Sequence, residues 1–246
     1  SDLGDPARAR RAIASSEEQL VRAKERMMLL FTPPFVDPPN DPGYINAYPA
    51  GLRENGGQYT HGVLWTVLAH AILGEGDRAK ELWQMLSPVH HTETPADVAR
   101  YRVEPYVVAA DVYAARGHEG AGGWTWYTGS AAWMYRIALE YILGVRRVAG
   151  GLHVAPAAPS GWSQFEITYR HGGSAYHVVV RNASSAPGVV KRVSLDGALL
   201  PSAIVPLVDD GRDHAVEVTV EPPEAPSSRT PQPPRVDSSD MGSVSR

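Results

Sequence analysis

The chain has 246 residues, of which 43% are hydrophobic and 20% charged, as is typical of a globular protein with room for one large or two modest domains. Its net charge of -4 and its lack of a basic stripe with interleaved aromatic residues argue against nucleic acid as a partner. The absence of cysteine excludes disulfides and cysteine-ligated zinc. No apolar run reaches the roughly 18 residues of a membrane span. The first residues are neither a methionine nor a signal peptide. We therefore expect a cytoplasmic location and a chain that is part of something longer.

The first 145 residues carry helical patterns that are separated by loops. Asp5 followed by proline is typical of an N-cap, and it predicts a helix from Ala7 to about Leu30. Residues 32–51 are rich in proline, asparagine and glycine and form a loop long enough to be functional. Further helices are predicted from Thr60, as N-cap, to Gly74, over 78–86, from Pro105 to about Arg116, and from Ser130 to Gly144. Helices joined in this way stack as antiparallel pairs, as in a helical toroid or solenoid.

The pattern changes after Gly150. Two strand-like runs, 165–170 and 175–181, flank a plausible hairpin turn at residues 171–174. Asp-Gly pairs at 196–197 and 210–211 mark further turns between short β-rich runs. These features predict a small antiparallel β-domain over 150–221. Proline, serine and arginine then replace large apolar residues, so we expect 222–246 to be a disordered tail.

The segment 124–133 concentrates aromatic residues, glycine and hydroxyls just before an apolar helical pattern. The first turn of a helix that begins near Ser130 has unpaired N–H groups and a partial positive charge. Thr128 beside Gly129 would let phosphate approach the backbone without a lysine. The neighbouring rings of Trp124 and Trp126 could pack against the C–H faces of a sugar. A simple helix cap with core aromatics is the alternative.

The segment 54–61 places His61 directly after a double glycine and a tyrosine, at the start of the next predicted helix. The glycines permit backbone geometry closed to other residues, and Tyr59 and His61 share one side if the segment is extended. An imidazole near a helix start would complement an anion. A purely structural His61 is the alternative.

Two other polar clusters receive plainer interpretations. His90 and His91, followed by Glu93 and Asp97, are taken as loop polarity and not as a metal site, because adjacent histidines rarely point at one ion. Glu104, before Pro105, either faces a cavity at the starts of the predicted helices or favours the dipole of the helix predicted from Pro105.

Five motifs in one order resemble the C-terminal part of glycoside hydrolase family 94, and are most similar to the phosphorylase-like domain of its cyclic β-1,2-glucan synthases. They are DPGY at 41–44, YPAGLRENGGQYTH at 48–61, TPAD at 94–97, YRVEPY at 101–106 and GWTWYTGS at 123–130. The likeness runs from near Ser1 to about Val220.

The resemblance implies a fold and an activity. Residues 1–149 would be the C-terminal portion of an (α/α)6 barrel, followed by a β-sandwich over 150–221. Family members carry out inverting phosphorolysis of β-glucosidic bonds, or the reverse synthesis, with inorganic phosphate as co-substrate and no other cofactor. The implied partners are a β-glucan or oligosaccharide, phosphate and the upstream half of the barrel. The resemblance also allows a homodimer, and tethering to the inner membrane through other parts of a larger enzyme.

By the same resemblance, His61, Thr128 and Gly129 would hold phosphate. Tyr48 and Arg53 would line the acceptor-sugar side, and Glu104 and Trp126 would help to shape the pocket.

Two departures from the family pattern matter. The glutamine that contacts the donor sugar is absent after Glu-Pro-Tyr, and Asp111 is a candidate substitute. The general acid of the family is an aspartate in a Trp-Asn-Asp motif further upstream, and no such motif occurs in this chain. The arginines that assist phosphate binding are missing as well. We therefore expect no catalytic residue here and negligible phosphorolysis by the chain alone. A non-catalytic carbohydrate-binding protein and a structural remnant are the alternatives.

Overall fold

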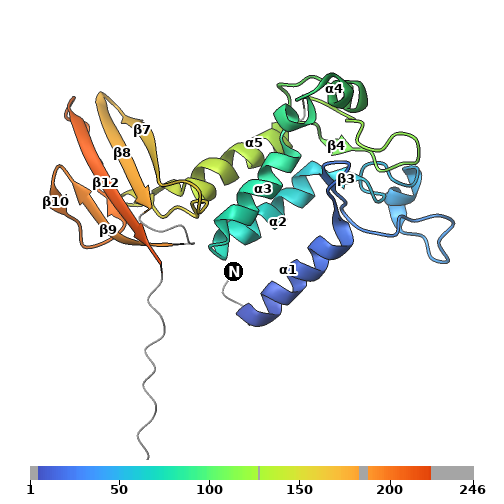
Figure 1. Cartoon of the computed structure of the whole chain (residues 1–246), viewed down its shortest axis with the longest axis horizontal. Coiled ribbons are helices and arrows are strands. Elements are labelled where there is room, and N and C mark those ends of the chain that lie inside the picture. Colours follow the sequence, from blue (N-terminus) through green and yellow to red (C-terminus); the bar gives the residue numbers. More distant parts are fainter. Residues whose placement is uncertain (1–4, 127, 183–187, 223–246) are drawn as a thin grey trace, which may run out of the picture.

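The computed structural model describes residues 5–126, 128–182 and 188–222, with helices up to residue 142 and mostly strands beyond (Figure 1). The predicted disordered tail lies outside the described residues except for Pro222. The helical elements are α1 (Pro6–Leu20), α2 (Thr60–Ile72), α3 (Gly76–Leu86), α4 (Pro95–Tyr101) and α5 (Thr128–Ile137), with short 3-10 helices at Gly43–Ala47 and Pro88–His91 and a π-helical turn at Ala138–Ile142.

Helix α1 begins where the sequence predicts it and ends ten residues earlier. The carboxylate of Asp5 accepts from the backbone N–H groups of Ala7 and Arg8, so the predicted N-cap is confirmed. The predicted end near Leu30 is wrong. A hairpin of β1 (Val21–Arg22) and β2 (Met27–Met28) follows the helix instead. The apolar residues at 20–21 and 27–30 are compatible with both structures, and burial of the two methionines in the core favours the hairpin.

Helices α2, α3 and α5 form one packed core, which includes Val63, Leu64, Leu82 and Ile137. Helices α2 and α3 begin and end within two residues of their predicted bounds, with Gly74 in the left-handed region between them. In Figure 1 these three helices lie side by side between the sheets and the loop-rich end of the molecule. This core sets the relative position of the starts of α2 and α5.

The helix predicted from Pro105 to Arg116 does not form. This stretch is a turn and a loop that contains β4 (Asp111–Val112), which pairs antiparallel with β3 (Gln58–Tyr59). Ala110 and Val112 are buried there. The predicted helix was wrong because burial in a small sheet outweighs the helical preference of an alanine-rich run.

The expected partial (α/α)6 barrel is also wrong. The described part of the chain holds five α-helices, and no ring of helix pairs is evident among them. Long loops with short strands occupy residues 30–59 and 102–126, where a barrel would need further helices. Apolar periodicity assigned 105–116 to a helix that does not form, because it does not show which apolar runs pair as strands, and it missed the short helix α4.

The β-region contains two sheets. Its strands are β5 (Val145–Val148), β6 (Gly151–Val154), β7 (Gln164–His171), β8 (Ser174–Asn182), β9 (Val189–Leu195), β10 (Ala198–Leu199), β11 (Ile204–Val205) and β12 (Asp213–Glu221). One sheet has the order β10-β9-β12-β8-β7 and the other β11-β6-β5. A valine-rich core draws residues from both sheets, among them Val154, Val178 and Val216.

The prediction of an antiparallel β-domain is wrong in one respect. The hairpin between β7 and β8 is confirmed, with His171 opposite Ser174. However, β12 runs parallel to β8, with Val216 opposite Val178, so the larger sheet is mixed. After β10 the chain crosses to β11 in the other sheet and returns between β9 and β8. Turn signals predict hairpins between neighbouring strands, but they do not say where a later strand inserts.

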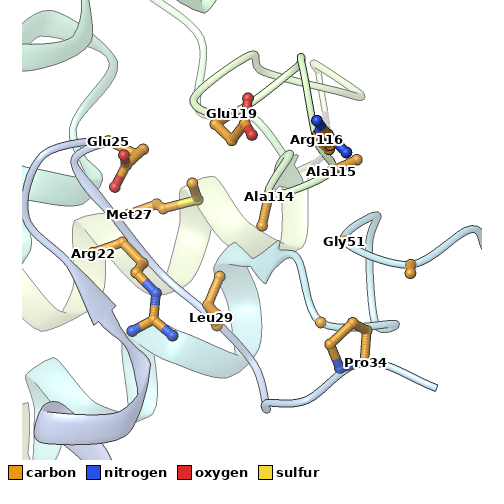
Figure 2. A pocket seen from close by; sticks show the side chains of 12 residues that line it. Arg22, Glu25, Met27, Leu29, Pro34, Gly51, Ala114, Ala115, Arg116 and Glu119 are labelled. Carbon is orange, nitrogen blue, oxygen red and sulfur yellow. The ribbon is translucent and has the colours of Figure 1, made fainter. Parts of the chain in front are cut away.

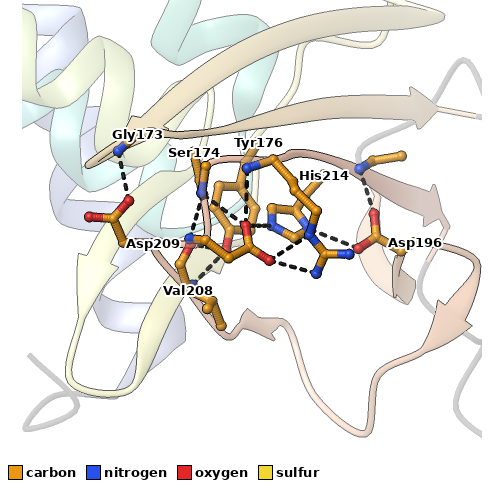
Figure 3. A network of polar contacts seen from close by, with 11 residues as sticks. Gly173, Ser174, Tyr176, Asp196, Val208, Asp209 and His214 are labelled. Atoms are coloured by element: carbon orange, nitrogen blue, oxygen red, sulfur yellow. Dashed lines mark hydrogen bonds and ion pairs between the residues drawn. The ribbon is translucent and has the colours of Figure 1, made fainter.

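A polar network at one end of this sheet surrounds His214 (Figure 3). Its Nδ1 lies 2.8 Å from Asp196 Oδ2 and its Nε2 lies 3.2 Å from Asp210 Oδ1. The ring stacks on Tyr176, and Arg212 donates to Asp210. The carboxylate of Asp196, and then that of Asp210, raises the pKa of His214 above its usual value.

This network predicts a pH dependence of stability. Because the pKa of His214 is raised in the folded state, its stabilising contribution is fully present below the unfolded value of about 6.5 and is lost as pH rises through the folded pKa. We expect His214→Gln to lower the melting temperature at pH 6 and to have a smaller effect at pH 9. Thermal melts of both proteins across this range test it, and an equal difference at every pH would contradict it.

Within the described ranges, no helix has the length and apolar character needed to cross a bilayer.

Candidate functional site

The two segments that the sequence singles out meet at strand β4. The Thr60 N–H donates to the carbonyl of Ala110 at 2.8 Å, and the Ala110 N–H donates to the carbonyl of Trp124 at 2.6 Å. The Gly123 N–H also donates to the carbonyl of Asp111 at 2.9 Å. The backbone at Ala110 and Asp111 therefore lies between the start of α2 and the segment that leads into α5.

His61 lies against the first turn of α5. It is the second residue of α2, and a methyl group placed on the Cα of Gly129 would be 3.7 Å from its Nδ1. The structure thus brings His61 and Gly129 together. The side chain of Thr128 lies outside the described residues, so its distance from His61 is not defined. That these residues hold phosphate stays a prediction.

Two tryptophans surround the His61 ring. Trp65, one turn further along α2, stacks at 6.5 Å with an interplanar angle of 14°, and Trp133 of α5 lies at 6.1 Å. The two indoles are 4.6 Å apart, and the guanidinium of Arg136 lies 5.1 Å from the Trp133 ring. Trp65 was missed by sequence reasoning, although its spacing of four residues from His61 places both on one helix face.

Thr60 does not act as the predicted N-cap. It is the first residue of α2, and Tyr59 occupies the cap position without a side-chain hydrogen bond. The hydroxyl of Thr60 instead accepts from Nε2 of the buried Gln58 at 3.1 Å, while Oε1 of Gln58 accepts from the Met28 N–H. Gln58 therefore fixes the chain just before His61.

A second group of predicted residues surrounds Arg53. Its guanidinium carbon lies 5.5 Å from the ring of Tyr48 and 5.0 Å from that of Trp124. Its Nε is 3.7 Å from Oε2 of Glu54, and neither atom has a hydrogen-bond partner among the described residues although both are buried. The two atoms face each other as an ion pair, and the side chains that carry them are 14% and 15% exposed. Sequence reasoning missed Glu54 as a site residue.

Asp111 is buried next to Trp124 of this second group. It is 0% exposed, and its Oδ1 accepts from the Trp124 N–H at 3.0 Å. Burial raises the pKa of its carboxyl, and the Trp124 N–H and the charge of Arg53 act in the opposite sense. A side chain at Gly123 would overlap the carboxylate, so only glycine fits there without rearrangement.

A third group, formed by Glu104, Tyr106 and Trp126, lies at the protein surface. The Trp126 Nε1–H donates to Oε1 of Glu104 at 3.2 Å, and Tyr106 contacts the indole edge-on. The Glu104 backbone N–H, then the side chains of Thr125 and Trp126, lower the pKa of the Glu104 carboxyl. Glu104 and Trp126 are therefore brought together, while Tyr106 and Trp126 are largely exposed.

The remaining histidine cluster and the cavity described next contain none of the predicted site residues. His91 is buried and stacks on Tyr101, and burial lowers its pKa to about 4. In the part of the chain that the structure describes, no three His, Asp or Glu side chains lie close enough to hold a metal ion. A cavity of about 460 Å³ lies between the β1–β2 hairpin and the loop 114–119, with Arg22, Glu25, Arg116 and Glu119 around it (Figure 2). None of the predicted site residues lines it.

Comparisons with known proteins agree with the motifs. The model of the glycosyl hydrolase 94 superfamily, catalytic domain, matches residues 1–144. The cyclic beta-(1,2)-glucan synthase NdvB of Rhizobium meliloti (strain 1021) is 46% identical over 191 residues, which are 77% of this chain and 7% of that protein. The N,N'-diacetylchitobiose phosphorylase of Vibrio proteolyticus is 34% identical over 194 residues, 78% of this chain and 24% of that protein. The solabiose phosphorylase of Paenibacillus borealis is 27% identical over 191 residues, with 77% and 24% covered. The chain thus spans a quarter or less of the length of these relatives.

Proposed function

This chain belongs to the glycosyl hydrolase 94 superfamily, and from that membership we propose that it is a carbohydrate-active module that binds inorganic phosphate beside a β-linked glucose unit. The observation that carries the proposal is the contact between His61 and the first turn of α5 at Gly129. Phosphate is proposed as co-substrate, with no resident cofactor. The relatives named as phosphorylases support this ligand.

The chemistry of the His61 group suits an anion. The first turn of α5 offers backbone N–H groups that have no partner within the helix, and the helix dipole favours negative charge there. The imidazole adds a hydrogen-bond donor from the start of α2. The indole rings of Trp65 and Trp133 lie beside the imidazole of His61.

We place the sugar next to Arg53 and next to the surface group of Glu104, Tyr106 and Trp126. The Tyr48 and Trp124 rings supply flat apolar faces, and the partly exposed side chains of Arg53 and Glu54 supply charged hydrogen-bonding groups. Such a combination fits a hexose, which presents C–H faces and hydroxyls. Trp126, held by Glu104, would form the outer wall.

The reaction proposed for the whole enzyme is inverting phosphorolysis of a β-glucosidic bond, or its reverse. Phosphate oxygen forms the new bond to the anomeric carbon, the bond to the leaving oxygen breaks, and a carboxylic acid gives that oxygen its proton. The residues of this chain would bind and orient phosphate and acceptor. The acid would come from another polypeptide segment, because the chain has no Trp-Asn-Asp motif.

A phosphate titration tests the proposal. We expect the chain to bind inorganic phosphate, and His61→Ala to weaken that binding by about 10- to 100-fold, which corresponds to about 1.5–3 kcal/mol for a hydrogen bond to a charged group. Isothermal titration calorimetry at constant ionic strength measures both affinities.

The exposed loop residue His118 provides the matched control. His118→Ala removes the same ring and should leave the phosphate affinity unchanged. Equal affinities for the wild-type and His61→Ala proteins, or no binding by either, would refute a phosphate site at His61.

A further inference from the structure

The buried carboxylate of Asp111 has a place in the fold that the proposed function does not use. Strand β4 carries Asp111 between two segments that bear candidate site residues. On one side Tyr59 pairs with Asp111, directly before α2 and His61. On the other side the Ala110 and Asp111 backbone bonds to Gly123 and Trp124, before α5. Any shift of β4 therefore changes the distance between the two segments.

The side chain of Asp111 adds a second connection. Its Oδ1 accepts from the Trp124 N–H at 3.0 Å, and the Arg53 backbone and charge lie close enough to favour its ionised form. The indole of Trp124 in turn lies 5.0 Å from the Arg53 guanidinium. One carboxylate thus accepts from the loop that carries Trp124 and lies near the charge of Arg53.

Direct contact between Asp111 and a sugar does not fit this arrangement. Asp111 is 0% exposed, and the Cα of Gly123 packs so closely on its carboxylate that a methyl group there would overlap both oxygens. A buried carboxylate is costly, and only Oδ1 of Asp111 has a hydrogen-bond partner among the described residues while Oδ2 has none, so its presence here calls for a role in holding its neighbours.

We propose that Asp111 is a positioning residue that holds the Trp124 loop against Arg53 and so sets the sugar-binding wall and the approach to α5. The inference rests on the proposed function for the ligand, while the positioning itself concerns the protein alone. It replaces the donor-sugar contact that the resemblance implies for Asp111.

The structural test compares Asp111→Asn with Asp111→Ala in the full chain. Asparagine keeps an oxygen acceptor for the Trp124 N–H, whereas alanine removes it. Amide hydrogen exchange followed by NMR should show Trp124 exchanging at least about tenfold faster in Asp111→Ala, and near the wild-type rate in Asp111→Asn. The Thr60 N–H, which donates to a backbone carbonyl, should stay protected in all three and so report that the chain is folded.

The functional test uses tryptophan fluorescence during titration with a β-1,2-glucan oligomer. We expect Asp111→Ala to weaken binding by about tenfold, and Asp111→Asn to restore most of it.

A double-mutant cycle tests the same contact from the Trp124 loop, and its Gly123→Ala arm keeps the carboxylate and so covers the case in which the Asp111→Ala variant is poorly folded. Gly123→Ala alone should weaken glucan binding by crowding the intact carboxylate, and should cost much less on the Asp111→Ala background, where the space is free. Additive effects of the two changes would overturn the proposal.

The outcomes separate this inference from the proposed function. If the wild-type chain binds no glucan, the proposed function fails, and hydrogen exchange still decides whether Asp111 holds the loop. Unchanged protection of Trp124 in Asp111→Ala would overturn the positioning role. So would loss of binding in Asp111→Asn as complete as in Asp111→Ala.

Discussion

A polypeptide of these 246 residues is expected to release glucose 1-phosphate from a β-1,2-glucan at least about 10²–10⁴-fold more slowly than a family member that carries its general acid. Protonation of the leaving oxygen requires a carboxylic acid that is protonated and within reach of the bond. Asp111 is fully buried beneath Gly123, so it cannot reach a bound sugar. Glu104 has a lowered pKa and accepts from Trp126, so it is ionised near neutral pH and cannot donate a proton.

The measurement is a coupled assay for glucose 1-phosphate with phosphate and glucan in excess. Its control is the phosphate titration on the same preparation, because a binding-competent protein without turnover separates loss of the acid from misfolding. Robust turnover that disappears in Glu104→Gln would contradict the prediction and place the acid within this chain.

Part of the candidate site could be predicted from the sequence because helix starts carry local signals. The double glycine before His61 and the Thr-Gly pair at 128–129 each mark a helix start without any knowledge of the fold. That the two starts are adjacent was expected from the resemblance, which places His61, Thr128 and Gly129 at one phosphate site, and no local pattern shows it. That adjacency depends on β4, which lies in a stretch predicted as helix. The groups at Arg53 and Glu104 also depend on contacts between loops, for which no periodic pattern exists.

The fold was predictable to a similar degree. Caps and stops such as Asp5 and Gly74 act through neighbouring residues, and they are confirmed. The barrel and the all-antiparallel β-domain were wrong because both depend on long-range pairing. The parallel contact of β12 with β8 joins residues almost 40 positions apart, and only the packed valine core specifies it.

Substitution of Gly144 by alanine is expected to destabilise the protein by about 2–6 kcal/mol. Gly144 has a φ of 70°, a left-handed conformation that costs a residue with a Cβ about 1–3 kcal/mol. Its carbonyl accepts from the Ala155 N–H at 2.8 Å, and a Cβ would overlap the backbone of Ala155 and Pro156. Overpacking of that kind adds about 1–3 kcal/mol. This contact joins the end of the helical region to the first residues after β6, so the strain affects both parts.

Gly150 offers a control that separates the two causes. It has a φ of 88°, also left-handed, and a Cβ there would meet open space. Gly150→Ala should therefore show the conformational cost alone, and urea unfolding should place its midpoint between those of the wild type and Gly144→Ala. If both variants lose the same stability, the close approach of Ala155 contributes nothing. A larger loss in Gly144→Ala than in Gly150→Ala, with an unchanged m-value, would instead show that the junction between helices and sheets tolerates no side chain, because the carbonyl of Ala155 already fills the space.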